Sequence, residues 1–274
     1  MNRRILTVQD ISCVGQCSLT VALPIISACG IETCILPSAV LSTHTGGFKD
    51  FTFRDLTEDI PKIAAHWKKE GISFDAIYTG YLGSARQIAY VQDIFFNLSN
   101  ENCLHIVDPA MADNGVLYVG FDGDFVAEMK KLCFGADIIL PNITEACLIT
   151  DTPYRETYDE RFIDELVGAL AGNGAKTFVL TGVSYHEDTM GVLVYENGTS
   201  RLYEHKRVAR GCHGTGDIYA SVFTGALLHG HDAYQAATIA ADFTLKCIEN
   251  TLDDKDHWYG VRFESVLPEL IARL

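Results

Sequence analysis

Short runs of β-branched and aromatic residues alternate with longer helical patterns along most of this chain. The short runs are 5–9, 33–36, 76–80, 105–107, 138–140 and 177–181. Between them, apolar residues recur at a spacing closer to 3.6 than to 2, at 58–70, 85–98, 125–134 and 159–171. Such alternation is typical of βαβ units, so we predict an α/β fold with a mostly parallel central sheet.

The pattern changes after residue 181. The segments 190–195 and 200–206 flank an Asn197-Gly198 pair, which predicts an antiparallel hairpin at the edge of the sheet. Helices are expected at 215–228, 234–249 and 264–274. The segment 42–56, which carries Thr45-Gly46-Gly47 and three phenylalanines, lacks the pattern of a core helix and is expected to form a small flap.

Pro24 interrupts the first helical pattern, 18–28, so that helix either starts near Ala22 or is kinked. No repeat, charge block or linker-like stretch divides the chain. At 274 residues it has a length that α/β folds reach as one unit, and we predict a single domain spanning 1–274.

Charge and cysteine usage limit the possible partners and the compartment. The chain has 21 Lys and Arg against 36 Asp and Glu, a net charge of −15, which opposes binding to nucleic acid or to a membrane surface. Its nine cysteines are scattered with no C-x-x-C pair, as expected for free thiols in a reducing compartment. We find neither a signal-peptide pattern nor an apolar run near the ~20 residues of a membrane span, and expect a cytoplasmic protein.

The strongest candidate motif is Gly211-Cys212-His213-Gly214-Thr215-Gly216-Asp217, which leads directly into a helical pattern. Glycines at a helix N-terminus let backbone N–H groups form an anion site, suited to charge on a transferring phosphoryl group. A carboxylate just beyond them, Asp217, could take a proton from an attacking hydroxyl. The equally weighted alternative is that Thr215 or Asp217 only caps the helix. Neither the P-loop nor the dinucleotide-binding motif is present.

A second cluster follows two neighbouring predicted strands. Asp108-Pro109-Ala110-Met111-Ala112-Asp113 comes after the run 105–107, and Pro141-Asn142-Ile143-Thr144-Glu145 comes after 138–140. Ligands of open α/β sheets bind outside the carboxyl ends of the strands, so these groups are expected to converge there. Such hard oxygen ligands suit Mg²⁺ held through water and substrate phosphates. The alternative for Asn142 and Glu145 is a capping box.

Two aromatic positions complete the candidates. Tyr81, in Thr79-Gly80-Tyr81-Leu82-Gly83-Ser84-Ala85, either offers a ring face to a flat ligand or is a packing residue. His44, on the expected flap, either faces a ligand or lies in a solvated loop.

Taken in this order, the segments resemble the ribokinase-like superfamily and, within it, the pyridoxal kinases of vitamin B6 salvage. The matching motifs are Thr-His-Thr-Gly-Gly at 43–47, Thr-Gly-Tyr-Leu-Gly-Ser-Ala at 79–85, Asp-Pro at 108–109 with Asp113, Pro-Asn-x-x-Glu-Ala at 141–146 and Gly-Thr-Gly-Asp at 214–217. The resemblance covers nearly the whole chain. It implies a three-layer α/β/α sandwich and phosphorylation of the 5′-hydroxymethyl group of pyridoxal, pyridoxamine or pyridoxine by ATP with Mg²⁺. Family members are commonly homodimers, and a monovalent cation is left open.

The resemblance also implies roles for individual residues. Asp217 would be the base, and Gly214, Thr215 and Gly216 would form the anion hole for the γ-phosphate. The remaining implied positions are Asp113 and Glu145 acting on Mg²⁺ through water, Asn142 and Thr181 near the ATP phosphates, and His44, Thr45 and Tyr81 around the pyridine ring.

The chain departs from the family pattern near its first strand. Many pyridoxal kinases have a Ser there that contacts the pyridine ring, whereas this chain has Asp10, with Ser12 two residues on. Asp10 could pair with a protonated ring nitrogen or a substrate amine, or cap a turn, so both residues are candidate substrate contacts. Which B6 vitamer is preferred stays open.

Two other functions are weighed against pyridoxal kinase. The His-Gly-Thr-Gly stretch, 213–216, also resembles hydroxymethylpyrimidine kinases of thiamine synthesis, which usually have Cys where this chain has Asp217. The third possibility is a non-catalytic B6-binding protein, against which an intact Asp217 argues.

Overall fold

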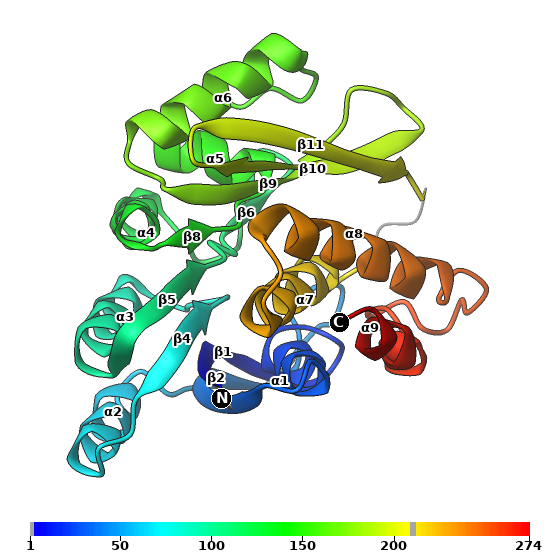
Figure 1. Cartoon of the computed structure of the whole chain (residues 1–274). Coiled ribbons are helices and arrows are strands. Elements are labelled where there is room, and N and C mark those ends of the chain that lie inside the picture. The colour runs from blue at the N-terminus through cyan, green and yellow to red at the C-terminus, as the bar shows by residue number, and fades with distance from the viewer. Residues whose placement is uncertain (1–2, 209–211) are drawn as a thin grey trace.

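A computed structural model describes residues 3–208 and 212–274 of the chain. Within these residues a nine-stranded sheet, in the order β11-β10-β9-β8-β5-β4-β1-β2-β3, runs through the molecule, and helices cover both of its faces (Figure 1). Its strands are β1 (Arg4–Val14), β2 (Glu32–Thr43), β3 (Phe53–Asp55), β4 (Phe74–Thr79), β5 (Ser99–Val107), β8 (Ile138–Ile139), β9 (Thr177–Val183), β10 (Thr189–Glu196) and β11 (Thr199–Lys206). A small second sheet pairs β6 (Ala112–Asp113) with β7 (Val116–Leu117).

The helices divide between the two faces of the large sheet. On one face are α1 (Leu19–Ala28), α7 (Thr215–His229), α8 (Ala233–Glu249) and, after the 3₁₀ turn Glu264–Val266, α9 (Leu267–Arg273). On the other are α2 (Ile60–Lys69), α3 (Ala85–Asn97), α4 (Gly123–Gly135), α5 (Ile143–Thr150) and α6 (Glu160–Gly172). Each helical layer encloses its own apolar cluster against the sheet. The α/β/α sandwich predicted from the sequence is confirmed.

The centre of the sheet is parallel because its strands are buried from both sides. Ile5, Leu6 and Val8 of β1 are fully buried, and they point alternately into the two apolar clusters. β1 pairs in parallel with β2 and β4, and the parallel pairing continues through β5 and β8 to β9. The edges are antiparallel, with β3 on one side and the β10–β11 hairpin on the other.

The predicted hairpin is confirmed in its turn as well as in its strands. Asn197 and Gly198 have φ values of 54° and 79°. Both values are in the left-handed region, which a two-residue turn of the favoured type requires at its two central positions.

Two sequence expectations are revised near the N-terminal half. α1 runs from Leu19 through Pro24, so a start near Ala22 is wrong. Burial of Leu19 and Val21 against the sheet offsets the hydrogen bond that the proline cannot donate. The expected flap, 42–56, includes the short edge strand β3, which no pattern had indicated.

The parallel centre brings the carboxyl ends of β1, β4, β5, β8 and β9 to one edge of the sheet. The pairing of β1 with β2 changes register between Gln9 and Ile11, the residues that flank Asp10. Such irregularities commonly redirect a side chain beside a binding site.

Candidate active site

The turn before α7 brings the glycine-rich loop close to the β1–α1 loop, residues 15–18. Gly214 is the N-cap of α7 and has φ +77°, a left-handed conformation that favours glycine. A Cβ added there would lie 1.7 Å from the backbone oxygen of Gln16. At Gly216, by contrast, an added Cβ would meet nothing within 4 Å. The loop is therefore tightly packed on one side and open at the helix N-terminus. Gly211, the first residue of the motif, lies outside the described residues.

Asp217 is the third residue of α7 and is only partly exposed. Burial raises the pKa of its carboxyl to about 7, and the negative charges of Asp108 and Asp10 act in the same direction. The backbone N–H of Ser18 donates to the carboxylate and opposes this rise. Since Gly214 occupies the N-cap position, neither Thr215 nor Asp217 is the cap of the helix.

Asp108, directly after β5, belongs to the same group of charges. Burial raises the pKa of its carboxyl well above the usual range, and the charge of Glu145 raises it further. Its Oδ1 accepts a hydrogen bond of 3.1 Å from the backbone N–H of Ala110. The sequence places Asp108 in the cluster that follows the strands but assigns it no individual role. Its position after a buried strand and before a proline was the available signal.

The N-terminus of α5 is held by the predicted capping box. The Asn142 Oδ1 accepts from the Glu145 backbone N–H at 2.9 Å, and the Glu145 Oε2 accepts from the Asn142 N–H at 3.0 Å. Glu145 Oε1 accepts a third bond, of 2.9 Å, from the N–H of Met111. Glu145 is 2% exposed, and burial raises its pKa to about 7 in spite of these donors. The capping interpretation is therefore confirmed.

Asn142 and Thr181 are brought together at adjacent strand ends. An isolated parallel bridge joins the two residues, and the Asn142 Nδ2 donates to the backbone oxygen of Ala112 at 2.8 Å. The side chain of Asn142 therefore also ties α5 to β6.

Asp113 lies on the β6–β7 hairpin and is exposed. The phenol of Tyr118, just after this hairpin, has its pKa raised by burial and then by the charges of Glu145, Asp113, Asp108 and Asp217. The four carboxylates therefore lie close enough to Tyr118 for their charges to act on its phenol. Across residues 3–208 and 212–274, no three His, Cys, Asp or Glu side chains form a group that could hold a metal ion by themselves.

A second group of candidate residues lies near the ends of β1 and β4. It consists of Asp10, Ser12 and Tyr81. Asp10 is 5% exposed, and the Ser12 hydroxyl donates to its Oδ2 at 3.0 Å. Burial raises the pKa of Asp10. Tyr81 is partly buried, its pKa is raised by burial and then by the charge of Asp10, and its ring lies 5.5 Å from that of Phe121. Tyr81 is thus packed against Phe121 on one side and lies close to Asp10 on the other.

His44 is 5% exposed, so the solvated-loop alternative is wrong. Its Nδ1 accepts from the Gly46 N–H at 3.1 Å, and its Nε2 therefore carries the proton that it donates to the backbone oxygen of Tyr259 at 2.7 Å. Burial lowers its pKa, which favours this neutral ring. Thr45, the next residue, is exposed.

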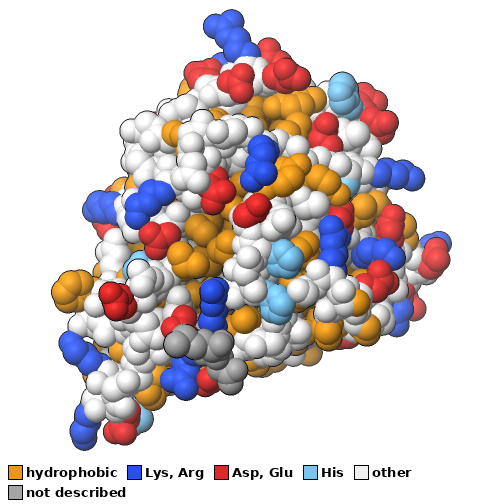
Figure 2. Space-filling model, viewed as in Figure 1, with side chains coloured by type: hydrophobic (Ala, Val, Ile, Leu, Met, Phe, Trp, Pro, Cys, Tyr) orange, Lys and Arg blue, Asp and Glu red, His pale blue; other side chains and the backbone are white. Residues whose placement is uncertain are grey.

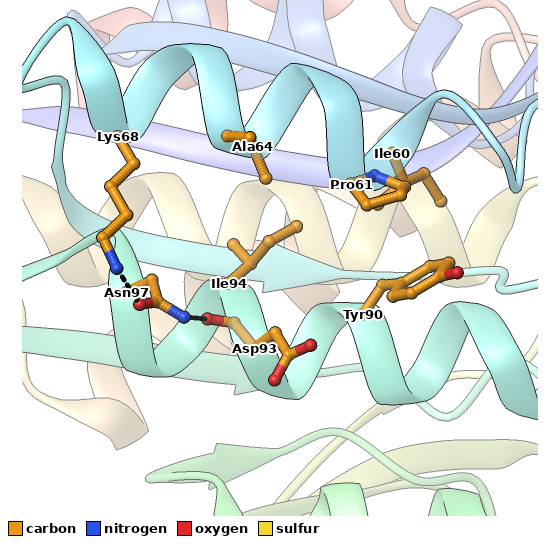
Figure 3. Close-up of a pocket in the computed structure, with 9 residues that line it drawn as sticks. Ile60, Pro61, Ala64, Lys68, Tyr90, Asp93, Ile94 and Asn97 are labelled. Carbon is orange, nitrogen blue, oxygen red and sulfur yellow. Dashed lines mark hydrogen bonds between the residues drawn. The ribbon is translucent and has the colours of Figure 1, made fainter.

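Other surface features lie apart from this site. A groove of about 300 Å³ between α2 and α3 includes none of the predicted site residues, and a hydrogen bond from Lys68 to Asn97 closes one end of it (Figure 3). Figure 2 shows Lys and Arg interspersed with acidic side chains on the face in view. In the part of the chain that the structure describes, no helix is long and apolar enough to cross a membrane.

The fold is consistent with the ribokinase-like kinases that the motifs resemble, and the glycine-capped α7 with its adjacent carboxylate lies at the carboxyl edge of its sheet. The family model described as phosphomethylpyrimidine kinase matches residues 23–261, and the chain belongs to that family.

Three relatives indicate its place among these kinases. A Bacteroides thetaiotaomicron protein, provisionally named a phosphomethylpyrimidine kinase and crystallised with pyridoxal, is 38% identical with a TM-score of 0.93, covering 98% of this chain and 96% of its own. The pyridoxal kinase of Lactobacillus plantarum is 32% identical with a TM-score of 0.91, covering 98% and 97%. A pyridoxine/pyridoxal/pyridoxamine kinase of Bordetella avium is 26% identical over 270 residues, covering 90% of this chain and 85% of its own.

Proposed function

We propose that the chain, acting as one kinase domain over residues 1–274, transfers the γ-phosphoryl group of ATP to the 5′-hydroxymethyl group of pyridoxal, pyridoxamine or pyridoxine. The observation that carries this proposal is Asp217, a carboxylate with a pKa of about 7 beside the glycine-capped N-terminus of α7. A base whose pKa lies near the working pH combines a usable ionised fraction with enough basicity to accept a proton. The likeness to pyridoxal kinases supports the choice of alcohol.

In this mechanism Asp217 takes the proton of the alcohol as the alcohol oxygen attacks the γ-phosphorus, and the bond between that phosphorus and the β–γ bridging oxygen breaks to release ADP. Gly214, Thr215 and Gly216 direct the backbone N–H groups and the positive end of the α7 dipole at the negative charge of the transferring group. The open space at Gly216 supports this role, because a phosphate needs close approach to the backbone.

The acidic side chains fit a cation held mainly by the nucleotide. Asp113 and Glu145 would act on Mg²⁺ through water, and Asn142 and Thr181 would lie beside the ATP phosphates. The cluster of raised carboxyl pKa values at Asp108, Glu145 and Asp217 favours such a cation, because a positive charge would lower all three. When bound, Mg²⁺ neutralises phosphate charge during transfer.

The vitamin would lie between the flap and the group formed by Asp10, Ser12 and Tyr81. Thr45, Tyr81, Asp10 and Ser12 would surround the pyridine ring together with His44. Because both ring nitrogens of His44 already bond within the protein, His44 would offer its ring face or its carbon edge. The buried Asp10 would meet a positively charged ring nitrogen or amine. We further propose a cytoplasmic homodimer.

A coupled ADP-release assay with ATP and Mg²⁺ tests this function on pyridoxal, pyridoxamine, pyridoxine and hydroxymethylpyrimidine in parallel, with Asp217→Asn as control. Turnover of a B6 vitamer that disappears in the control supports the proposal. Activity on hydroxymethylpyrimidine alone would favour the second candidate function, which the family description supports. Tight pyridoxal binding without ADP release would favour a non-catalytic binding protein.

A further inference from the structure

Residues 257–264, which we call the strap, lie between α8 and α9 and end on the first residue of the 3₁₀ turn. Residues 257–263 belong to no element or motif predicted from the sequence. The strap contacts the flap and the β1–α1 loop, the two segments that flank the proposed vitamin site. The inference below rests on the function proposed above.

The first contact fixes the flap through His44. The backbone oxygen of Tyr259 accepts the Nε2 proton of His44 at 2.7 Å, while the Gly46 N–H donates to Nδ1. The strap therefore sets the tautomer and the orientation of the imidazole. Because the same ring also accepts from Gly46, it transmits the position of the strap to the flap backbone.

The second contact is made by Trp258. Its ring lies 4.6 Å from the ring of Phe48, centre to centre. At Gly47, which has φ +84°, an added Cβ would be 2.8 Å from the Trp258 Cζ3. The flap backbone thus passes directly over the indole, and only glycine allows this approach.

The third contact fixes the β1–α1 loop through Gln16. The Gln16 Nε2 donates to Glu264 Oε1 at 2.5 Å, and its Oε1 accepts from the Nε2 of His257 at 3.0 Å. Both ends of the strap therefore hold one side-chain amide. The backbone oxygen of Gln16 in turn lies against Gly214, at the start of α7.

The flap also approaches the loop before α7 directly. The rings of His44 and His213 are 5.1 Å apart, and a Cβ added at Gly46 would lie 2.6 Å from the His213 ring. The strap, the flap, the β1–α1 loop and the N-terminus of α7 thus form one continuous set of contacts.

We propose that the strap is a positioning element for the alcohol substrate. It holds the flap and the β1–α1 loop at a fixed distance from α7, so that the vitamin ring is bound with its hydroxymethyl group directed at Asp217. Gln16 and Trp258 act through the segments that they hold and are positioning residues. Reactions of this kind are sensitive to displacements of about 1 Å in the supporting structure.

Steady-state kinetics separate this role from a general structural one. Trp258→Ala and Gln16→Ala should each raise the vitamin KM about fivefold to tenfold, as expected for one or two lost contacts, and leave the ATP KM within about twofold. His44→Ala should show the same asymmetry, whereas Trp258→Phe should recover most of the vitamin affinity. The exposed Lys255, two residues before the strap, provides Lys255→Ala as a matched control with wild-type constants. Equal rises in both KM values would overturn the proposal.

Hydrogen exchange of the unliganded protein tests the strap without relying on turnover. Trp258→Ala should increase exchange in peptides covering 44–49, and Gln16→Ala should do so in peptides covering 15–18, with α3 and α6 unchanged. Unchanged exchange in both regions would refute the strap. A wild-type protein inactive on every B6 vitamer but with the expected exchange would instead refute the proposed function alone.

Discussion

Two helices begin at the same edge of the sheet, and each has a carboxylate at its third position, Glu145 in α5 and Asp217 in α7. In α5, Asn142 caps the helix with its side chain, and Glu145 accepts backbone N–H groups with both oxygens. In α7 the cap is Gly214, which has no side chain, and Asp217 accepts from the backbone of Ser18 in another loop.

The comparison shows that a raised pKa alone does not identify a base. Burial raises the pKa of both carboxyls to about 7. They differ in hydrogen bonding, since the Glu145 carboxylate joins two backbone segments, at Met111 and Asn142, whereas Asp217 lies in the first turn of a helix whose glycine cap leaves open space in front of it. The first arrangement fixes the carboxylate to the backbone, which fits the water-mediated contact with Mg²⁺ proposed above, and the second leaves a carboxylate available to a substrate.

The largest expected effect is on turnover. Asp217→Asn should lower kcat about 10²–10⁴-fold, the usual contribution of a general base, while the circular dichroism spectrum and ATP binding stay unchanged. Coupled ADP release measures the loss. A wild-type kcat in this variant would mean that Asp217 is not the base. The comparison between Glu145 and Asp217 would then lose its basis.

The pH dependence of kcat/KM for the vitamin should follow the same carboxyl. Because the base acts in its ionised form and its pKa is raised to about 7, kcat/KM should fall roughly tenfold per pH unit below 7 and level off above it. Initial rates between about pH 5 and pH 8 test this expectation. A profile that is flat down to pH 5 would mean that another group accepts the proton.

The two glycines of the α7 turn offer a matched pair of variants. Gly214→Ala should destabilise the protein and abolish activity, because its Cβ would meet the Gln16 oxygen. Gly216→Ala has room and should keep or raise the melting temperature, since Ala favours helix by about 1 kcal/mol. The Gly216→Ala substitution should instead raise the ATP KM. A normal ATP KM would indicate that phosphate does not approach this position.

For α5 the effect should be on stability. Glu145→Gln places an amide donor against backbone N–H groups, and should lower the free energy of unfolding by about 1–3 kcal/mol in urea titrations. Asp113→Asn, at an exposed position nearby, is the control and should change it by less than about 0.5 kcal/mol. Equal stability of the two variants would contradict the structural role of Glu145.

The smallest effect is a gain in stability for Asp217→Asn. The folded pKa of about 7 lies above the ordinary value of 3.8, so folding favours the protonated form. Ionisation of the carboxyl therefore lowers the free energy of unfolding. This penalty is absent below the ordinary pKa, grows as the pH rises and reaches its full size above about pH 7. Asn avoids the penalty, and the variant should melt ~2–6 °C higher at pH 8 and equally near pH 4. A lower melting temperature at pH 8 would show that the charge is compensated.

The parallel centre of the fold could be predicted because its strands are continuous apolar runs, and the hairpin because Asn197-Gly198 has a distinctive turn chemistry. Strand lengths were underestimated where the run is broken. β2 continues well past Leu36. Pro37 is tolerated inside the strand because it pairs with Gln9, at the point where the pairing of β1 with β2 changes register. The short strand β3 depends on its pairing with β2 and has no local pattern. β6 and β7 pair with each other across Asn114-Gly115, a turn signal that the sequence analysis did not use.

The site was predicted as far as its residues follow strand ends or open helices. The contacts of the strap were not predictable in this way, since the hydrogen bond from His44 to Tyr259 spans 215 residues and that from His257 to Gln16 spans 241. Side-chain partners so distant leave no periodicity or spacing to recognise.

The position of α7 in the chain has a consequence for synthesis. All nine strands of the large sheet end by Lys206, whereas the helix that carries Asp217 starts at Thr215, and the strap comes later still. As the chain emerges from the ribosome, every strand of that sheet is therefore synthesised before the base, but α7, α8 and α9, which cover one face of the sheet, are not. A product interrupted between these points would lack both the base and three of the four helices on that face, so turnover reports only on chains extended past the strap.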